Sequence, residues 1–309
     1  MGTPEIVAKR ESDSNIDLHI HSHFSDGINS PEEIREEARQ EGVKLFSITD
    51  HNYIGADARL IKDGQKKFSF LQGIEISSLD RVTDEPLHIL GYSYNFNIPQ
   101  INRSLASVVE GYNIRAKNII AKLNDKFSSG FDFEEIKKET PAAFVSRNLL
   151  AKKLTEFVGN GMIMTEALNE AFIDEDNSWL PGAEDVIGLI QNCGGIAVLA
   201  HPGNILEKTS IEELIKRLGA AGLGGIEAFY PKHSPKTTGV LINLAKKYQL
   251  IITAGSDWHG RNFSASPLGI KVPAWIYESC IIFFSDLKSK ILLKKNDQTG
   301  SPRAYGGAS

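Results

Sequence analysis

Short apolar runs bounded by polar residues or glycines recur along the chain and define a predicted sheet. Seven runs, each of the length of a buried strand, cover residues 16–21, 44–49, 68–74, 87–94, 195–200, 224–230 and 250–254. Helical patterns follow several of them, at residues 31–40 (with Ser30 as the expected N-cap), 211–220 and 235–248. Strands that alternate with helices predict a largely parallel α/β sheet. About seven strands favour a barrel, with an open doubly wound sheet as the alternative.

The middle of the chain has a different pattern. Residues 101–127, 133–139, 148–158 and 164–172 all have helical periodicity, and strand patterns are absent there. We predict an α-helical insertion that caps the functional site. A long crossover packed on the outside of the barrel is the equally favoured alternative. The expected organisation is a first barrel segment at 15–98, the insertion at 99–182, a second barrel segment at 183–294, and flexible termini at 1–14 and 295–309.

Composition limits the classes of function. The 309 residues are 41% hydrophobic and 24% charged, as in an ordinary globular protein, and carry a net charge of −5. No broad basic surface is expected to attract long nucleic acid. The two cysteines have no metal-site or disulfide spacing, and neither a secretory signal nor a membrane-spanning run is evident, so we expect a cytoplasmic location.

Histidines and carboxylates collect where the predicted strands begin or end. His19 and His21 alternate on one strand and therefore share a face, as do Asp257 and His259. The remaining residues of this kind at strand ends are His51, Glu75, His88 and His201. Such side chains meet at one face of a parallel barrel, and imidazole with carboxylate is the usual ligand set of Zn, Mn or Fe. Asp50, beside His51, is expected to orient a neighbouring imidazole, with a turn or N-cap role as the alternative.

These motifs, in this order, resemble those of the PHP (polymerase and histidinol phosphatase) family. The motifs are His19-x-His21, Ser25-Asp26-Gly27, Thr49-Asp50-His51, Glu75, His88, His201-Pro202 and Asp257-x-His259. The resemblance covers most of the chain. It implies a distorted (β/α)7 barrel with a trinuclear metal site that hydrolyses phosphoesters.

The resemblance also implies the metal ligands. His19, His21, Glu75 and Asp257 would hold the first ion, Asp26, His51 and His201 the second, and a bridging Glu75 with His88 and His259 the third. We expect three divalent ions per chain, with manganese preferred and zinc or iron as alternatives. The implied reaction is attack by a metal-bridging hydroxide, with Asp257, His201 and Glu75 as the catalytic residues.

The substrate is expected to be a small phosphorylated metabolite. The motifs most resemble the branch of nucleoside 3′,5′-bisphosphate phosphatases and short-oligonucleotide 5′-exonucleases. Arg147, at the start of a helix in the insertion, and His233, after a strand end, are the candidate phosphate-binding residues, with Lys232 as a weaker candidate. Related enzymes carry an Arg-Pro-His segment near the first of these, whereas here Asn148 and Leu149 follow the arginine.

Other functions are open within and outside this class. Histidinol-phosphate or cyclic-phosphate hydrolysis is the alternative within the family. A C–N hydrolase with fewer metals, or a non-catalytic PHP module, is the alternative of another kind. The full set of nine candidate ligands argues against a degenerate module.

Overall fold

The structure is a computed structural model that describes residues 13–55, 69–159, 161–173, 177–205, 210–261, 263–264 and 266–299, with side chains as far as residue 287. Among these residues, none of the helices combines the length and the apolar character that crossing a bilayer requires.

Eight strands form one sheet in the order β7-β6-β5-β4-β3-β2-β1-β8. Their bounds are β1 Ser14–Ile20, β2 Leu45–Ile48, β3 Ser69–Asp80, β4 Glu85–Ser93, β5 Ile196–Leu199, β6 Gly225–Phe229, β7 Ile251–Ala254 and β8 Ile270–Val272. The sheet nearly closes, because the chain after β7 returns to β1: His21 N donates to Trp258 O (2.8 Å) and Asp257 N donates to His19 O (2.9 Å). The predicted α/β barrel is confirmed.

Two strands break the parallel order. β4 is antiparallel to both β3 and β5, and β8 is antiparallel to β1. A tight turn containing Asp84 in the left-handed region (φ 56°) joins β3 to β4 as a hairpin. The start of β4 therefore lies beside the later part of β3, and His88 pairs with Ser77. The hairpin explains how a histidine near the beginning of a strand joins side chains at the ends of the others.

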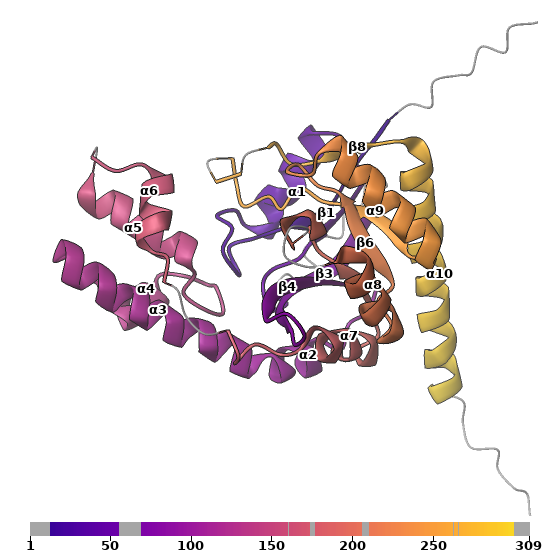
Figure 1. Ribbon diagram of the computed structural model, residues 1–309, viewed down its shortest axis with the longest axis horizontal. Coiled ribbons are helices and arrows are strands. Elements are labelled where there is room, and N and C mark those ends of the chain that lie inside the picture. The colour runs from indigo at the N-terminus through magenta and orange to yellow at the C-terminus, as the bar shows by residue number, and fades with distance from the viewer. Residues whose placement is uncertain are drawn as a thin grey trace, which may run out of the picture.

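Helices cover the outside of the barrel (Figure 1). They are α1 Pro31–Gln40, α7 Ala183–Asn192, α8 Ile211–Ala220, α9 Pro235–Tyr248 and α10 Ala274–Thr299. Ser30 caps α1 as predicted, because its side chain accepts a hydrogen bond from Glu33 N and Ser30 N donates one to the carboxylate of that glutamate. The barrel core between helices and sheet includes the fully buried Ile74, Leu90, Val198 and Ile226.

The insertion consists of α2 Ile98–Ser104, α3 Ala106–Phe127, α4 Phe133–Lys138, α5 Arg147–Val158 and α6 Met164–Glu170. The predicted helix over 101–127 is broken near Leu105 into α2 and α3. α3 to α6 share an apolar core of their own, which includes Leu123, Leu150 and Leu154, whereas Ile101 of α2 belongs to the barrel core. In Figure 1 they lie on one side of the barrel, and α10 lies on the opposite side. α10 runs to Thr299, so the first part of the expected flexible tail is helical, whereas residues 1–12 and 300–309 lie outside the described residues.

Candidate metal centre

The barrel brings together nine histidine and carboxylate side chains that are far apart in the sequence. His19 and His21 come from the end of β1, and His51 follows β2. Glu75 lies in β3, and its backbone forms an isolated β-bridge with that of His51. His88 comes from the start of β4, His201 follows β5, and Asp257 and His259 follow β7. Asp26 lies in the loop after β1. Each of the nine lies within 4.0 Å of another member through side-chain nitrogen and oxygen atoms.

Glu75 lies at the centre of this cluster, and each of its two carboxylate oxygens contacts a different set of imidazoles. Its Oε2 lies 3.1 Å from His19 Nε2, 3.2 Å from His21 Nε2 and 3.2 Å from His51 Nδ1. Its Oε1 lies 2.9 Å from His88 Nδ1 and 3.2 Å from His201 Nε2. A carboxylate with a different set of imidazoles at each oxygen has the arrangement of a bridging metal ligand.

Three groups of ligand atoms are compact enough to hold an ion, with all members of a group within 4.8 Å of one another. The first group is His19, His21, Glu75 and Asp257. This is the set expected for the first ion.

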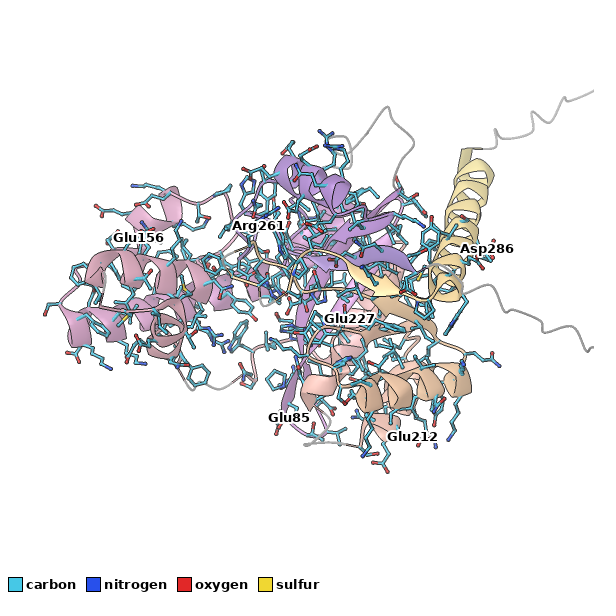
Figure 2. All side chains as sticks on the ribbon, turned by 90° about the horizontal axis from the view of Figure 1, so that it is seen from above. Glu85, Glu156, Glu212, Glu227, Arg261 and Asp286 are labelled. Atoms are coloured by element: carbon cyan, nitrogen blue, oxygen red, sulfur yellow. The ribbon has the colours of Figure 1, made fainter. Side chains whose placement is uncertain are left out.

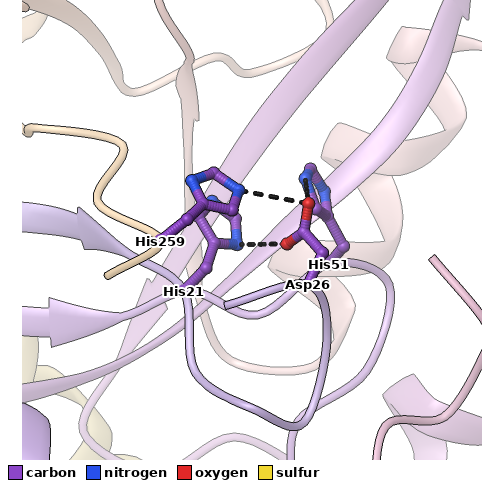
Figure 3. Close-up of side chains that lie close together, drawn as sticks. All are labelled: His21, Asp26, His51 and His259. Atoms are coloured by element: carbon purple, nitrogen blue, oxygen red, sulfur yellow. Dashed lines mark hydrogen bonds and ion pairs between the residues drawn. The ribbon is translucent and has the colours of Figure 1, made fainter. Parts of the chain in front are cut away.

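The second group is His21, Asp26, His51 and His259, and the third is His51, Glu75 and His88. Figure 3 shows the second group, in which Asp26 Oδ2 lies 3.1 Å from His259 Nε2 and Asp26 Oδ1 lies 3.6 Å from His21 Nδ1. The ligand sets that the resemblance implies pair these residues differently, with His259 beside Glu75 and His201 beside Asp26. The geometry places His259 beside Asp26 and His201 beside Glu75 Oε1.

Several side-chain nitrogen and oxygen atoms in this cluster are buried and have no hydrogen-bond partner. They are His19 Nε2, both ring nitrogens of His21, Asp26 Oδ1, His51 Nδ1 and Glu75 Oε2. They approach one another closely but lack hydrogen-bond geometry. Leaving such groups unsatisfied is costly, and divalent cations would satisfy them together. Imidazole nitrogens with carboxylate oxygens suit manganese, zinc and iron alike, so the residues present fit a cluster of such ions.

The charges of the cluster also suit cations. Burial alone would raise the pKa of Glu75, but the imidazoles of His19, His51 and His88 hold it well below its usual value. The pKa of Asp26 and that of Asp257 are likewise lowered by neighbouring histidines against the effect of burial. Three ionised carboxylates therefore face one another in a confined space.

The histidines divide between protonated and neutral forms. Burial would lower the pKa of His21, but its contacts with Asp257 and Glu75 raise it to about 10. The pKa of His51 falls to about 3 because burial outweighs its carboxylate neighbours. Without cations, protons on some imidazoles must balance the carboxylates, and cations would displace those protons.

The backbone is strained at two of these positions. His201 has φ 28° and Asp257 has φ 56°, both in the left-handed region that residues other than glycine seldom adopt. Such conformations cost roughly 1–3 kcal/mol each and collect at functional sites, where the surrounding structure enforces them. His201 lies two residues after β5 and Asp257 three residues after β7, so both strained positions lie in the segments that leave the carboxyl ends of these strands.

Surrounding residues hold the candidate ligands in place, and Glu227 of β6 is the main one that the sequence interpretation missed. This fully buried carboxylate accepts a hydrogen bond from His201 N (2.7 Å) and lies 3.0 Å from His19 Nδ1. A carboxylate inside an apolar strand was the available signal, since burying one without a partner is costly. Tyr230 donates to Asp257 Oδ2 (3.2 Å), and Asn148 Nδ2 of α5 donates to Asp26 Oδ2 (3.1 Å).

Two sequence predictions require correction. Asp50 does not orient an imidazole through a hydrogen bond: its oxygens accept from Ser22 N (2.8 Å), Ser22 Oγ (2.6 Å) and Ser25 Oγ (2.7 Å), which fixes the loop after β1. His233 Nε2 accepts from Gly203 N (3.0 Å), and its Nδ1 lies 3.0 Å from Ala228 O. Burial lowers the pKa of His233, and with both nitrogens engaged by backbone it is not placed to bind phosphate.

A cavity of about 390 Å³ opens over the cluster. Glu75, His201, Asp257 and His259 form part of its floor. Arg147, at the first turn of α5, and Lys232, after β6, line its walls, so both remaining candidates for phosphate binding face this space. The cavity therefore combines a carboxylate and histidine floor with cationic walls.

Comparisons with known proteins agree with this architecture. A model of the PHP domain matches residues 17–221, more than half of the chain. The chain is 32% identical over 258 residues to the 3′,5′-nucleoside bisphosphate phosphatase of Chromobacterium violaceum, covering 80% of this chain and 87% of that protein. It is 29% identical over 268 residues to the phosphoribosyl 1,2-cyclic phosphate 1,2-diphosphodiesterase of Eggerthella lenta, covering 84% of this chain and 99% of that protein.

A solved structure has the same fold. An amidohydrolase from Chromobacterium violaceum, with bound sulfate and no metal, superimposes with a TM-score of 0.69 at 27% identity, covering 86% of this chain and 97% of that one. The predicted family and the predicted likeness to the bisphosphate phosphatases are confirmed. The chain belongs to the PHP family of metal-dependent phosphoesterases.

Proposed function

We propose that the chain is a phosphatase that hydrolyses a phosphate monoester of a small, nucleotide-like metabolite, with three divalent ions held by the nine converging side chains. The observation that carries the proposal is the set of buried, unpartnered nitrogen and oxygen atoms under an open cavity. The 32% identity to a nucleoside bisphosphate phosphatase supports the substrate class.

The contacts among the nine side chains suggest which residues hold each ion. His19, His21, Glu75 and Asp257 would hold the first. Asp26, His51 and His259 would hold the second. Glu75 Oε1, His88 and His201 would hold the third, since both imidazoles contact that oxygen. We favour manganese, with zinc or iron as alternatives that this ligand set also accepts.

Divalent ions bound there would lower the pKa of a water molecule and offset the charge of the phosphate. The residues of the chain would then supply positioning and proton transfer. We assign proton acceptance to Asp257, whose Oδ2 is held by the Tyr230 hydroxyl and whose Oδ1 lies 3.3 Å from His21 Nε2. The guanidinium of Arg147 and the ammonium of Lys232, on the cavity walls, would pair with phosphate oxygens.

Hydrolysis of a cyclic phosphate is the second candidate. The relative from Eggerthella lenta, named for this reaction, aligns over 99% of its own length. Such a substrate would need the same metal residues and the same cationic walls. The two candidates differ in the phosphate ester that enters the cavity, so a substrate panel separates them.

The test is phosphate release by manganese-loaded protein from a panel containing p-nitrophenyl phosphate, nucleoside 3′,5′-bisphosphates and a ribosyl cyclic phosphate. We expect a phosphomonoester to be the best substrate, and His201→Ala and Asp257→Asn to abolish turnover. His23→Ala is the matched control, because this histidine lies outside the nine and should leave turnover intact. Turnover that persists in both His201→Ala and Asp257→Asn would refute the proposed function.

A further inference from the structure

A second cavity of about 290 Å³ lies between the insertion and the barrel. It shares part of its lining with the cavity over the metal centre, namely Asp26, His51, His88, Arg147 and Asn148. A molecule whose phosphate lies over the metal residues can therefore extend its other end into this second space. Its volume is close to the lower limit of about 300 Å³ that is typical of small-ligand pockets.

Three aromatic side chains line the second cavity, and we call it the aromatic chamber. They are Tyr112 of α3, Phe144 in the segment before α5, and Phe172 after α6. The Tyr112 and Phe144 rings pack with their centroids 4.9 Å apart, and the Tyr112 hydroxyl donates to Ser77 Oγ (2.8 Å) in β3. These two rings are thus fixed against both the insertion and the barrel.

Phe172 differs from the other two because it is 52% exposed and is available to a ligand. The Arg147 guanidinium carbon lies 6.0 Å from its ring centroid. Arg115, also in the lining, is held by Asn177 (2.6 Å) with its guanidinium carbon 5.1 Å from the Trp179 ring. The chamber therefore offers the exposed ring of Phe172 beside the guanidinium of Arg147, next to a wall made of Tyr112 and Phe144.

This chemistry selects a planar, electron-rich ring. Nucleic-acid bases stack on aromatic side chains and on arginine planes, whatever their identity, because every base has a π-face. A bare sugar has no π-face, so it would gain no stacking on these rings.

We propose that the aromatic chamber binds the heterocyclic base of the substrate, so that the protein prefers base-bearing nucleotides to base-free sugar phosphates. This inference rests on the proposed phosphatase function. It adds the residues that recognise the base of the nucleoside, which is the group that leaves the phosphate on hydrolysis. Phe172 is the accessible stacking surface, and Tyr112 and Phe144 form the rigid wall.

Binding of adenosine to the manganese-loaded protein, measured by calorimetry, tests the chamber without catalysis, because adenosine has no phosphate to lose. Phe172→Leu keeps an apolar side chain but removes the ring, and should weaken adenosine binding roughly 5-fold or more, as expected for a lost base–aromatic stack. Phe172→Tyr should retain binding. Phe157→Leu is the matched control, since this phenylalanine is 50% exposed on α5 but does not line the chamber.

Kinetics then separate this inference from the function on which it rests. Wild-type protein should hydrolyse adenosine 3′,5′-bisphosphate with a higher kcat/KM than ribose 5-phosphate, and Phe172→Leu should lower only the first value. Equal adenosine binding by wild type and Phe172→Leu, or equal effects on both substrates, would overturn the role of the chamber while leaving the phosphatase proposal intact. Hydrolysis of neither substrate would contradict the phosphatase proposal, and adenosine binding would still decide the role of the chamber.

Discussion

Glu227 Oε1 lies 3.0 Å from His19 Nδ1, and both side chains are completely buried. The other oxygen of the same carboxylate accepts a hydrogen bond from the backbone of His201. One side chain thus contacts His19, a candidate ligand of the first ion, and fixes the strained turn that carries His201, a candidate ligand of the third. Figure 2 shows Glu227 within the barrel, whereas Glu156 lies on the outer part of the insertion.

Glu227→Gln should therefore weaken metal binding by about 10- to 100-fold, the usual cost of losing a group that orients a metal-bound histidine. The amide keeps the size of the side chain but loses its charge and one acceptor position. Competition with a chromophoric chelator measures the affinity for manganese or zinc. Glu156→Gln, on the exposed face of α5, is the control and should bind metal like wild type. Unchanged affinity in Glu227→Gln would show that His19 and His201 are held by other contacts.

At Gly255 the chain after β7 passes close to β1. A Cβ at this position would lie 2.2 Å from His19 Cβ and 2.5 Å from Glu227 Oε1, far inside van der Waals contact. Gly255→Ala should destabilise the protein by about 1–3 kcal/mol through overpacking and should also lower metal occupancy. Urea unfolding and elemental analysis measure the two effects.

Gly239→Ala in α9 is the matched control, because a Cβ there would meet nothing within 4 Å. This substitution should stabilise α9 by about 0.5–1 kcal/mol relative to glycine and leave metal content unchanged. Metal loss in both alanine variants, or in neither, would contradict the role given to the contact at Gly255.

Arg147 is the strongest candidate for a residue that binds substrate without binding metal. Its side chain lines both cavities and is exposed to solvent. Arg147→Ala should raise KM by about 10-fold or more, as expected for the loss of a charge-assisted hydrogen bond to phosphate, and should leave metal content unchanged. Arg147→Lys should recover part of the affinity. If metal is lost in parallel with KM, the arginine supports the metal centre rather than the substrate.

The barrel and the convergence of most candidate ligands could be predicted from the sequence because both depend on local pattern, whereas Asp26 became a candidate only through the family resemblance. Short apolar runs define strands, and polar residues at their ends must meet at one face once the strands form a barrel. His88 lies near the start of β4, and it joins the cluster only because β3 and β4 form an antiparallel hairpin. The apolar pattern alone does not distinguish an antiparallel strand from a parallel one. The expected PHP barrel is confirmed, and the nine residues are brought together.

Tertiary contacts decided what the sequence interpretation missed. β8 has three residues, too few for a periodic signal, and it forms because β1 offers it an edge. In the sequence Glu227 is one polar residue in a strand, and only the fold brings its partners His19 and His201 next to it. His233 was expected to bind phosphate from its place after a strand, but Gly203 and Ala228 occupy its two nitrogens. Partners that arrive from elsewhere in the chain cannot be read from local spacing.

The central claim is that the nine side chains hold several divalent ions at once. Crystals grown with manganese, measured near its absorption edge, test it most directly through the anomalous difference map. We predict three peaks, one at each group of donors, with Glu75 contacting more than one of them. A map without peaks among these residues, or with a single ion that leaves His88 and His259 uncoordinated, would contradict the account.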